Sequence, residues 1–387
     1  MRIVLNTRTE IENVGSRVWI HNLQQRLSEH GIAATLNDWE HYDRYDVAVF
    51  LGYDYDVENA RKQNPNIRIA IADPKQSRPE WIEIARQADF LMVSSVEQRD
   101  FFLRLNNDIM IYYCLPTMPA IEKIHVDKRP IIIGYHGNLA HIACMHGGLQ
   151  LALNELAKSY DLEFWAIYNI ANLGKAEFGM PDENLMKIRH IQWTWQNYYD
   201  ELAHVDIGIV PNEIPIKDKQ HILKLGAYAQ QQIRSKPFDH LLRLKVSCNP
   251  ARMYPFAQLG IPVVADFAPS ASQFIYDGES GFIVSSPNGW YQALEMMINS
   301  AKLRNKMAHN LHRCMKVAYD KQIELFLEFC RKDLIKTQPI QFEGYPTVEE
   351  QLAQVPHYLP QKPKPWGYKT KKRLWKLLKN FSYSGVQ

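Results

Sequence analysis

The clearest structural pattern in the chain reads R-M-Y-P-F-A-Q-L-G-I-P-V-V-A-D at residues 252–266, followed by D-G-E-S-G-F-I-V at residues 277–284. The first part predicts a helix, a tight Gly-Pro turn and a strand, because an apolar run bounded by turn residues is typical of a buried parallel strand. The second part predicts an Asp-Gly turn and another strand. This order of elements indicates an α/β domain with a ligand crevice at the carboxyl ends of its strands.

Strand and helix patterns alternate outward from this stretch over most of the chain. Further strand patterns lie at residues 2–7, 32–36, 46–51, 67–72, 90–94, 109–115, 131–137, 162–167, 188–192 and 205–210. Such alternation favours parallel sheets with helices on both faces. We therefore predict an α/β protein in which two Rossmann-like domains face a central cleft.

The domain boundaries follow from shifts in composition. A proline-containing, charged linker separates an N-terminal domain over residues 1–128 from a C-terminal domain over residues 129–320. A stretch rich in lysine and glutamine, residues 213–243, interrupts the second domain and is predicted to be an insertion. Residues 321–337 are predicted to form a crossover helix that returns to the first domain. Residues 338–387 are predicted to be an irregular segment followed by a basic amphipathic tail.

Composition narrows the class of protein. With 387 residues and 46% hydrophobic residues, the chain can support about two domain cores. No apolar run approaches the roughly 20 residues of a membrane-spanning helix, and the N-terminus leads directly into a strand, so we expect a cytoplasmic protein. The cysteines are odd in number, lack C-x-x-C spacing and are expected to be reduced thiols; they are Cys114, Cys144, Cys248, Cys314 and Cys330.

The positive charge is concentrated in the tail. Eight basic residues lie between Lys362 and Lys379, no acid follows Glu350, and without these eight the net charge of +3 becomes −5. Leucines and Phe381 form one helical face, with lysines mostly opposite, over residues 370–381. This pattern is typical of helices that bind anionic membranes, and it predicts a peripheral membrane contact through residues 362–381. The alternative is a tail that docks on its own protein or on another acidic partner. No nucleic-acid partner is expected.

The start of the helix in the opening stretch suits a phosphate group. Asn249 is a good N-cap residue, Pro250 fits the first helical position, and Arg252 lies within the first turn. A helix N-terminus attracts anions, and Lys245 and Ser247 lie just before it. The sequence predicts a diphosphate site here; the alternative is an ordinary capped helix with a surface arginine.

The opening stretch resembles the C-terminal half of GT-B fold glycosyltransferases of family 4, where E-A-M-A-x-G-x-P-V-V precedes D-G-x-x-G. The resemblance implies transfer of a sugar from a nucleotide-sugar co-substrate, without a cofactor, to a glycan or lipid-linked saccharide acceptor. It further implies bacterial surface polysaccharide synthesis at the inner face of the membrane. By the same resemblance, transfer retains the configuration of the sugar.

Three acids of that family pattern are absent. The family's paired glutamates fall on Ser247 and Pro255, and Gln273 stands where relatives place another glutamate, whereas Arg252 occupies the position of a family lysine. The missing acids leave a second hypothesis open, in which the chain is a non-catalytic GT-B-fold binding or scaffold protein at the membrane.

Four further residues are candidates for the same site. His136 and Gly137 follow a strand in a loop that resembles the family's G-R-L loop; His136 either donates to a phosphate or packs beneath the loop. Gly15, at a strand-helix turn, allows close approach of substrate to the backbone, or is a turn glycine without a ligand. Asp73 follows a strand and is our candidate catalytic residue, as a base or acceptor-binding carboxylate; alternatively, it caps the turn before Pro74.

Two other patterns have less specific interpretations. Asp54-Tyr55-Asp56 matches a metal-binding D-x-D motif, but a two-residue match is common by chance, and we favour a solvent-facing loop. No histidine or carboxylate cluster indicates any other metal site, so we expect transfer that does not depend on a metal ion. A dense aromatic group favours core or interdomain packing over base stacking; its members are Trp193, Trp195, Tyr198 and Tyr199.

Overall fold

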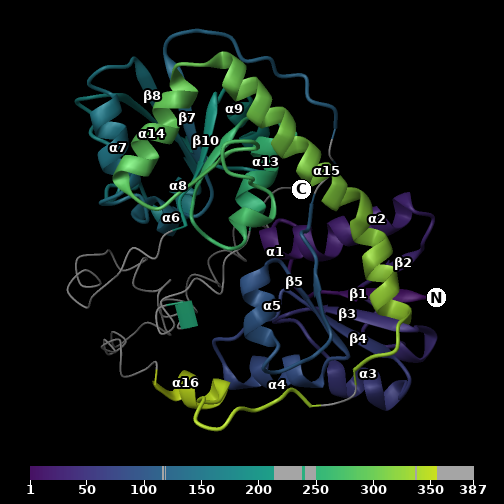
Figure 1. Ribbon diagram of the computed structural model, residues 1–387. Coiled ribbons are helices and arrows are strands. Elements are labelled where there is room, and N and C mark those ends of the chain that lie inside the picture. Colours follow the sequence, from purple (N-terminus) through teal and green to yellow (C-terminus); the bar gives the residue numbers. More distant parts are fainter. Residues whose placement is uncertain (116, 118, 213–237, 240–249, 336–337, 355–387) are drawn as a thin grey trace, which may run out of the picture.

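The computed structural model describes residues 1–115, 117, 119–212, 238–239, 250–335 and 338–354. Within these residues the chain forms two parallel six-stranded sheets, each in its own domain and flanked by helices. Figure 1 shows the first domain below and the second above. The predicted α/β class with two Rossmann-like domains is confirmed.

The first sheet has the strand order β2-β1-β3-β4-β5-β6. Its strands are β1 (Ile3–Asn6), β2 (Ala34–Leu36), β3 (Val47–Leu51), β4 (Arg68–Ala72), β5 (Phe90–Val93) and β6 (Ile109–Ile111). Its helices are α1 (Val14–Ser16), the π-helical η1 (Arg17–His21), α2 (Asn22–Glu29), the 3-10 turn η2 (Tyr42–Arg44), α3 (Val57–Gln63), α4 (Pro79–Gln87) and α5 (Val96–Phe102). All residues of β3 and β5 are buried, because helices cover both faces of a parallel sheet.

The second sheet has the order β12-β11-β10-β7-β8-β9. Its strands are β7 (Ile131–His136), β8 (Leu162–Tyr168), β9 (Lys187–Gln192), β10 (Ile207–Val210), β11 (Val263–Asp266) and β12 (Phe282–Val284). Its shorter helices are α6 (Leu139–Ala143), α7 (Leu149–Leu156), α8 (Ile170–Leu173), α9 (Tyr198–Ala203), η3 (Pro250–Arg252), α13 (Met253–Gln258), η4 (Ala271–Gln273) and α14 (Pro287–Ile298). Consecutive strands β7, β8 and β9 extend to one side, whereas β10 pairs on the other side of β7, so the chain reverses direction between β7 and β10. A parallel sheet binds ligands at such a reversal.

A single helix, α15 (Ala301–Arg331), joins the two domains and runs from the upper to the lower domain in Figure 1. Its first half packs Met307 and Leu311 into the second domain, and its second half packs Ile323 and Phe326 into the first. The crossover helix therefore begins earlier than predicted from the sequence and ends at Arg331 rather than at 337. The charged face of α15 obscured this continuity in the sequence.

The predicted linker packs against the second domain. The ammonium of Lys123 donates to the carbonyl oxygens of Ala203 and Val205, at 2.6 Å each. His125 Nε2 lies 2.8 Å from the carbonyl oxygen of Gly260. Residues 123–125 are thus fixed by hydrogen bonds to the second domain.

Two segments of the C-terminal half reach the first domain. Phe238, from the predicted insertion, is fully buried with its ring 4.9 Å from that of Phe101 on α5. The helix α16 (Val348–Gln354) buries Val348 in the same core, and Arg104 donates to Gln351 Oε1 at 2.8 Å. The rest of the insertion, the site candidates Lys245, Ser247 and Asn249, and the basic tail at residues 362–381 lie outside the described residues. In the described part of the chain, no helix is both long enough and apolar enough to span a membrane.

Candidate functional site

Two strand ends and one short helix of the second domain converge at the reversal between β7 and β10. β7 ends with His136 and is followed by Gly137, β10 is followed by Pro211 and Asn212, and η3 contributes Arg252. The Arg252 guanidinium donates to the Pro211 carbonyl oxygen at 2.7 Å and to Asn212 Oδ1. These bonds use two of its five N–H groups and fix a cation at this edge of the second sheet.

A buried carboxylate supports this arrangement from below. Asp266, the last residue of β11, accepts hydrogen bonds from the backbone N–H of Asn212 at 2.7 Å and from the Trp290 indole at 3.0 Å. Asn212 in turn accepts from Arg252. The ends of β10 and β11 and the start of α13 therefore belong to one hydrogen-bonded network.

His136 lies beneath this edge. Its Nε2 is 2.8 Å from the carbonyl oxygen of Arg252, which can only accept, so Nε2 carries the proton. Burial lowers the pKa of His136 to about 4, with the charge of Arg252 acting in the same direction. The ring packs edge-on against Phe256 at 5.0 Å. Of the two interpretations from the sequence, the packing role agrees with this geometry.

The aliphatic part of the Arg252 side chain packs against Gly137 and leaves no room there for a larger residue. Its φ of +134° disfavours any residue with a side chain, and a Cβ there would lie 3.1 Å from Arg252 Cδ. The backbone of the loop therefore lies directly against the arginine, and a ligand held by Arg252 also faces the Gly137 main chain.

The first domain presents its own strand ends to the same interdomain region. Asp73 follows β4 with φ of +54°, and its carboxylate contacts the Lys75 ammonium. Tyr53 follows β3; burial, and next the charge of Asp73, raise its pKa to about 12. A Cβ on Gly15 would lie 2.9 Å from the Tyr53 hydroxyl oxygen, so the glycine is needed for close packing of these loops. The structure places Gly15 near Tyr53, and Tyr53 near Asp73. Tyr53 and Lys75 were not among the site residues predicted from the sequence.

The D-x-D pattern has a structural role. Asp54 Oδ2 accepts from the Thr7 and Thr9 hydroxyls, at 2.9 and 2.8 Å, and from the backbone N–H of Arg8. Asp56 accepts from Tyr42 and Asn59. Both acids lie in a loop, as favoured, but they are half-buried rather than fully solvent-facing, and Asp54 anchors the loop that follows β1. Across the described residues, no group of three or more His, Cys, Asp or Glu side chains gathers as a potential metal site.

The aromatic group after β9 contacts the first domain. The Trp195 indole donates to the Glu12 carbonyl oxygen at 2.9 Å, and the Arg17 guanidinium lies 4.3 Å from the Trp195 ring centroid. Trp193 and Tyr198 pack against Trp195 at 5.0 and 5.8 Å. This geometry agrees with the favoured interdomain packing.

A second interdomain contact joins α5 to the loop after β11. Glu97 Oε1 accepts from the Ser270 backbone N–H at 2.8 Å, and Gln273 Oε1 accepts from the Val96 backbone N–H at 3.1 Å. Gln273 also donates to the Tyr113 hydroxyl at 2.6 Å. Glu97 was missed because its partner is 173 residues away and no local pattern marks it.

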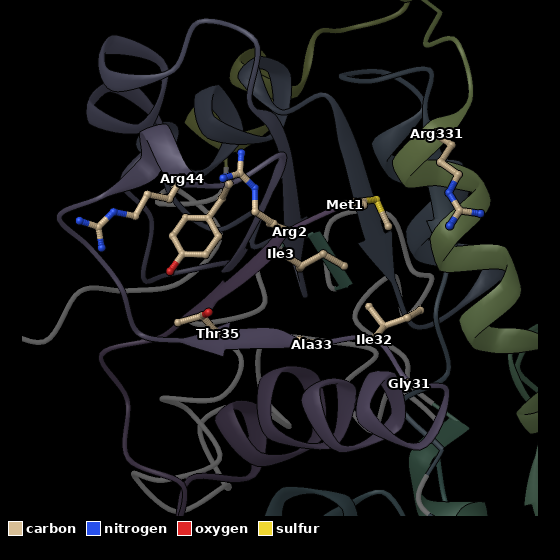
Figure 2. A pocket seen from close by; sticks show the side chains of 10 residues that line it. Met1, Arg2, Ile3, Gly31, Ile32, Ala33, Thr35, Arg44 and Arg331 are labelled. Atoms are coloured by element: carbon tan, nitrogen blue, oxygen red, sulfur yellow. The ribbon is translucent and has the colours of Figure 1, made fainter.

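A cavity of about 550 Å³ lies elsewhere in the first domain. Figure 2 shows its wall at the amino ends of β1 and β2, with Arg44 and Arg331 on opposite sides. Because the candidate site lies at the carboxyl ends of the strands, this cavity is separate from it.

Comparison with known proteins supports the fold. No protein-family model matches the chain, and no curated protein matches it. Among solved structures it is similar to sucrose-phosphate synthase from Thermosynechococcus elongatus, with 10% identity over 84% of this chain and 96% of that one and a TM-score of 0.52. It is also similar to Anabaena HepE in complex with UDP-glucose, with 12% identity over 85% and 99% and a TM-score of 0.50.

The chain is also similar in structure to the lipopolysaccharide outer core galactosyltransferase WaaB, with 13% identity over 85% of this chain and 99% of WaaB and a TM-score of 0.50. The chain spans 55% of the length of TarM, where the TM-score is 0.46. At these identities the similarity concerns architecture. With its two parallel sheets and one connecting helix, the chain has the two-domain α/β fold of the GT-B glycosyltransferases.

Proposed function

We propose that this protein is a glycosyltransferase that moves a sugar from a nucleotide-sugar to a glycan or lipid-linked saccharide. The observation that carries the proposal is the fixed cation of Arg252 against the Gly137 backbone, at the reversal between β7 and β10. A diphosphate suits a crevice with an arginine and closely approachable backbone. Lys245, Ser247 and Asn249, outside the described residues, complete the proposed donor site with His136 as the support beneath Arg252.

The donor class that we propose is a UDP-sugar. HepE, whose fold this chain shares, is described in complex with UDP-glucose. The proposal extends that ligand class to the present chain, and it makes UDP and UDP-glucose the first compounds to test.

In the proposed reaction, an acceptor hydroxyl attacks the anomeric carbon while the bond from that carbon to the diphosphate oxygen breaks. The diphosphate leaves with the bonding electron pair, and Arg252 stabilises its charge. The hydroxyl proton passes to a diphosphate oxygen on the same face, so configuration is retained. Asp73, beside Lys75 and Tyr53 on the facing edge, accepts a hydrogen bond from that hydroxyl and orients it.

Transfer is proposed to be independent of metal ions. The diphosphate charge is met by Arg252 and backbone N–H groups, and Asp54 and Asp56 already accept bonds from their own domain. Activity that survives EDTA supports this point, whereas activity restored only by a divalent cation contradicts it.

We further propose that residues 362–381 hold the protein at the inner, anionic face of a bacterial membrane, where surface polysaccharides are built. Deleting the chain from Lys362 onward should release the protein from vesicles that contain phosphatidylglycerol. A second variant, in which the tail keeps its leucines and Phe381 but has its lysines changed to glutamine, tests the contribution of the positive charge alone. Undiminished binding of both variants contradicts the membrane role.

The function is tested by product formation. The protein is incubated with nucleotide-sugars and detergent-dispersed lipid-linked saccharides, and the released nucleoside diphosphate and extended saccharide are measured. Acceptor-dependent release of both products is expected, with the new glycosidic bond in the donor's configuration by proton NMR.

A non-catalytic role is the second candidate, because Pro255 is buried inside α13 at a position where a glutamate would face the donor in the resembled family. Detectable sugar transfer excludes this role, whereas nucleotide-sugar binding without turnover on any acceptor favours it.

A further inference from the structure

Glu97 occupies a position where both domains meet. α5 follows β5 directly, so its first turn lies at the carboxyl edge of the first sheet. The carboxylate of Glu97 reaches the second domain, where Oε1 accepts a hydrogen bond from the Ser270 backbone N–H at 2.8 Å. Ser270 belongs to the loop that follows Asp266, the end of β11, and Asp266 is bonded to the Asn212 that holds Arg252. The Glu97 carboxylate is therefore bonded to the loop that leads on from one of the strand ends of the proposed donor site.

One oxygen of this carboxylate lacks a partner. Glu97 is 3% exposed, and its Oε2 has no hydrogen-bond partner among the described residues. A buried, unpaired carboxylate oxygen is costly, and the cost is removed when a hydroxyl or N–H donates to it. By contrast, both oxygens of the nearby Asp266 accept bonds from the protein. Among these two acids, Glu97 retains the unused acceptor.

We infer that Glu97 is a specificity-determining residue of the donor site: its Oε2 accepts a hydrogen bond from a hydroxyl of the transferred sugar. This inference rests on the proposed function and adds that the first domain, not the second, supplies the carboxylate that recognises the sugar. The diphosphate is held by Arg252, whereas the sugar extends toward the β11 loop and Glu97. Nucleotide and sugar are thus recognised by side chains of different domains.

The test compares the binding of two ligands that differ only in the presence of the sugar. We compare binding of UDP and UDP-glucose by calorimetry, or of whichever pair the wild-type protein binds among UDP, GDP, ADP and TDP and their sugars. The variant Glu97→Gln keeps an oxygen for the Ser270 N–H and removes the charge. The matched control is Asp100→Asn, on the exposed side of the same helix.

Glu97→Gln should weaken binding of the nucleotide-sugar about 5- to 10-fold and leave the nucleoside diphosphate within about 2-fold, because a charged acceptor is replaced by a neutral amide. Asp100→Asn should leave both unchanged. Equal weakening of both ligands, or of neither, overturns the inference and leaves Glu97 as a domain contact. Failure of the wild-type protein to bind any member of the panel contradicts the proposed function itself.

Analogues of the sugar provide a second measurement on the unaltered protein. Among nucleotide-sugars that each lack one hydroxyl, one should bind the wild-type protein about 10-fold more weakly, and the same deletion should matter less in Glu97→Gln. Equal losses for that analogue in both proteins would show that the hydroxyl does not contact Glu97.

Discussion

The ring of His136 and the main chain of Arg252 are joined by a 2.8 Å hydrogen bond from Nε2–H to the arginine carbonyl oxygen. This bond ties the end of β7 to the start of α13, so the loop and the helix that border the proposed diphosphate site hold each other in place. The imidazole that donates this bond is neutral at pH 7, because burial lowers the pKa of His136 to about 4 although the bond itself acts in the opposite direction.

Acid should therefore destabilise the protein through His136. Because its folded pKa lies below the unfolded value of 6.5, the stabilisation is complete above pH 6.5 and is lost as the pH falls toward 4. His125, whose pKa burial also lowers to about 4, behaves in the same way. From pH 7 to 5 each histidine should cost ~2 kcal/mol in the free energy of unfolding.

Denaturant unfolding at pH 7 and pH 5 measures this dependence. His136→Gln keeps a donor for the Arg252 carbonyl but does not titrate. In this variant the loss of unfolding free energy between pH 7 and pH 5 should fall by the contribution of His136, and the contribution of His125 should remain. An unchanged pH dependence in His136→Gln would show that His136 is not held neutral in the folded protein.

Gly137→Ala should impair both stability and donor binding. The φ of +134° strains alanine, and the new Cβ would lie 3.1 Å from Arg252 Cδ, which displaces the guanidinium. A loss of ~1–3 kcal/mol is expected, with loss of the thermal shift caused by UDP. Gly147→Ala is the control, because φ is +75° there but nothing lies within 4 Å of a Cβ. Gly147→Ala should lose stability but keep the thermal shift caused by UDP. If Gly137→Ala also keeps this shift, Gly137 does not position Arg252.

Gly15→Ala should be rescued by a second substitution. Alanine at this helical position introduces a Cβ 2.9 Å from the Tyr53 hydroxyl oxygen, and such overpacking costs ~1–3 kcal/mol. Removing that hydroxyl with Tyr53→Phe should restore most of the melting temperature in the double variant. Strictly additive losses would instead place the strain at Asn13, whose Oδ1 lies 3.2 Å from the same Cβ.

Asp73→Asn should reduce turnover without weakening the donor. Asparagine tolerates the positive φ of this position, so the backbone should be preserved while the charge is removed. We expect kcat to fall roughly 10²-fold, because the acceptor hydroxyl loses its orienting carboxylate, and KM for the donor to stay unchanged. An unaltered kcat would leave Asp73 with only its turn and its contact to Lys75.

The architecture was predictable because it rests on local patterns. Apolar runs such as residues 263–265 and 47–51 become buried strands, and the turn at Gly260 ends α13 as expected. The placement of His136, Gly137 and Arg252 at one edge also follows from strand order, since the carboxyl ends of parallel strands meet there.

Contacts between the domains were not predictable in the same way. Glu97 with Ser270 and Trp195 with Glu12 join residues 173 and 183 positions apart, and they depend on how two separately folded sheets face each other. The hydrophobic periodicity of a single helix or strand carries no information about how the two sheets face each other. The half-buried Asp54 is a similar case, because its partners in the loop after β1 lie across the sheet rather than along the sequence.

The most direct test of the central claim is a thermal-shift comparison of the wild-type protein with Arg252→Ala, against nucleoside diphosphates and their sugars. A ligand specific for the native state must raise the melting temperature. We predict a clear shift for one nucleotide class in the wild-type protein and in Arg313→Ala, a control on the exposed face of α15, and its loss in Arg252→Ala. No shift with any nucleotide, or an equal shift in Arg252→Ala, would contradict a nucleotide-sugar site at this edge of the second sheet.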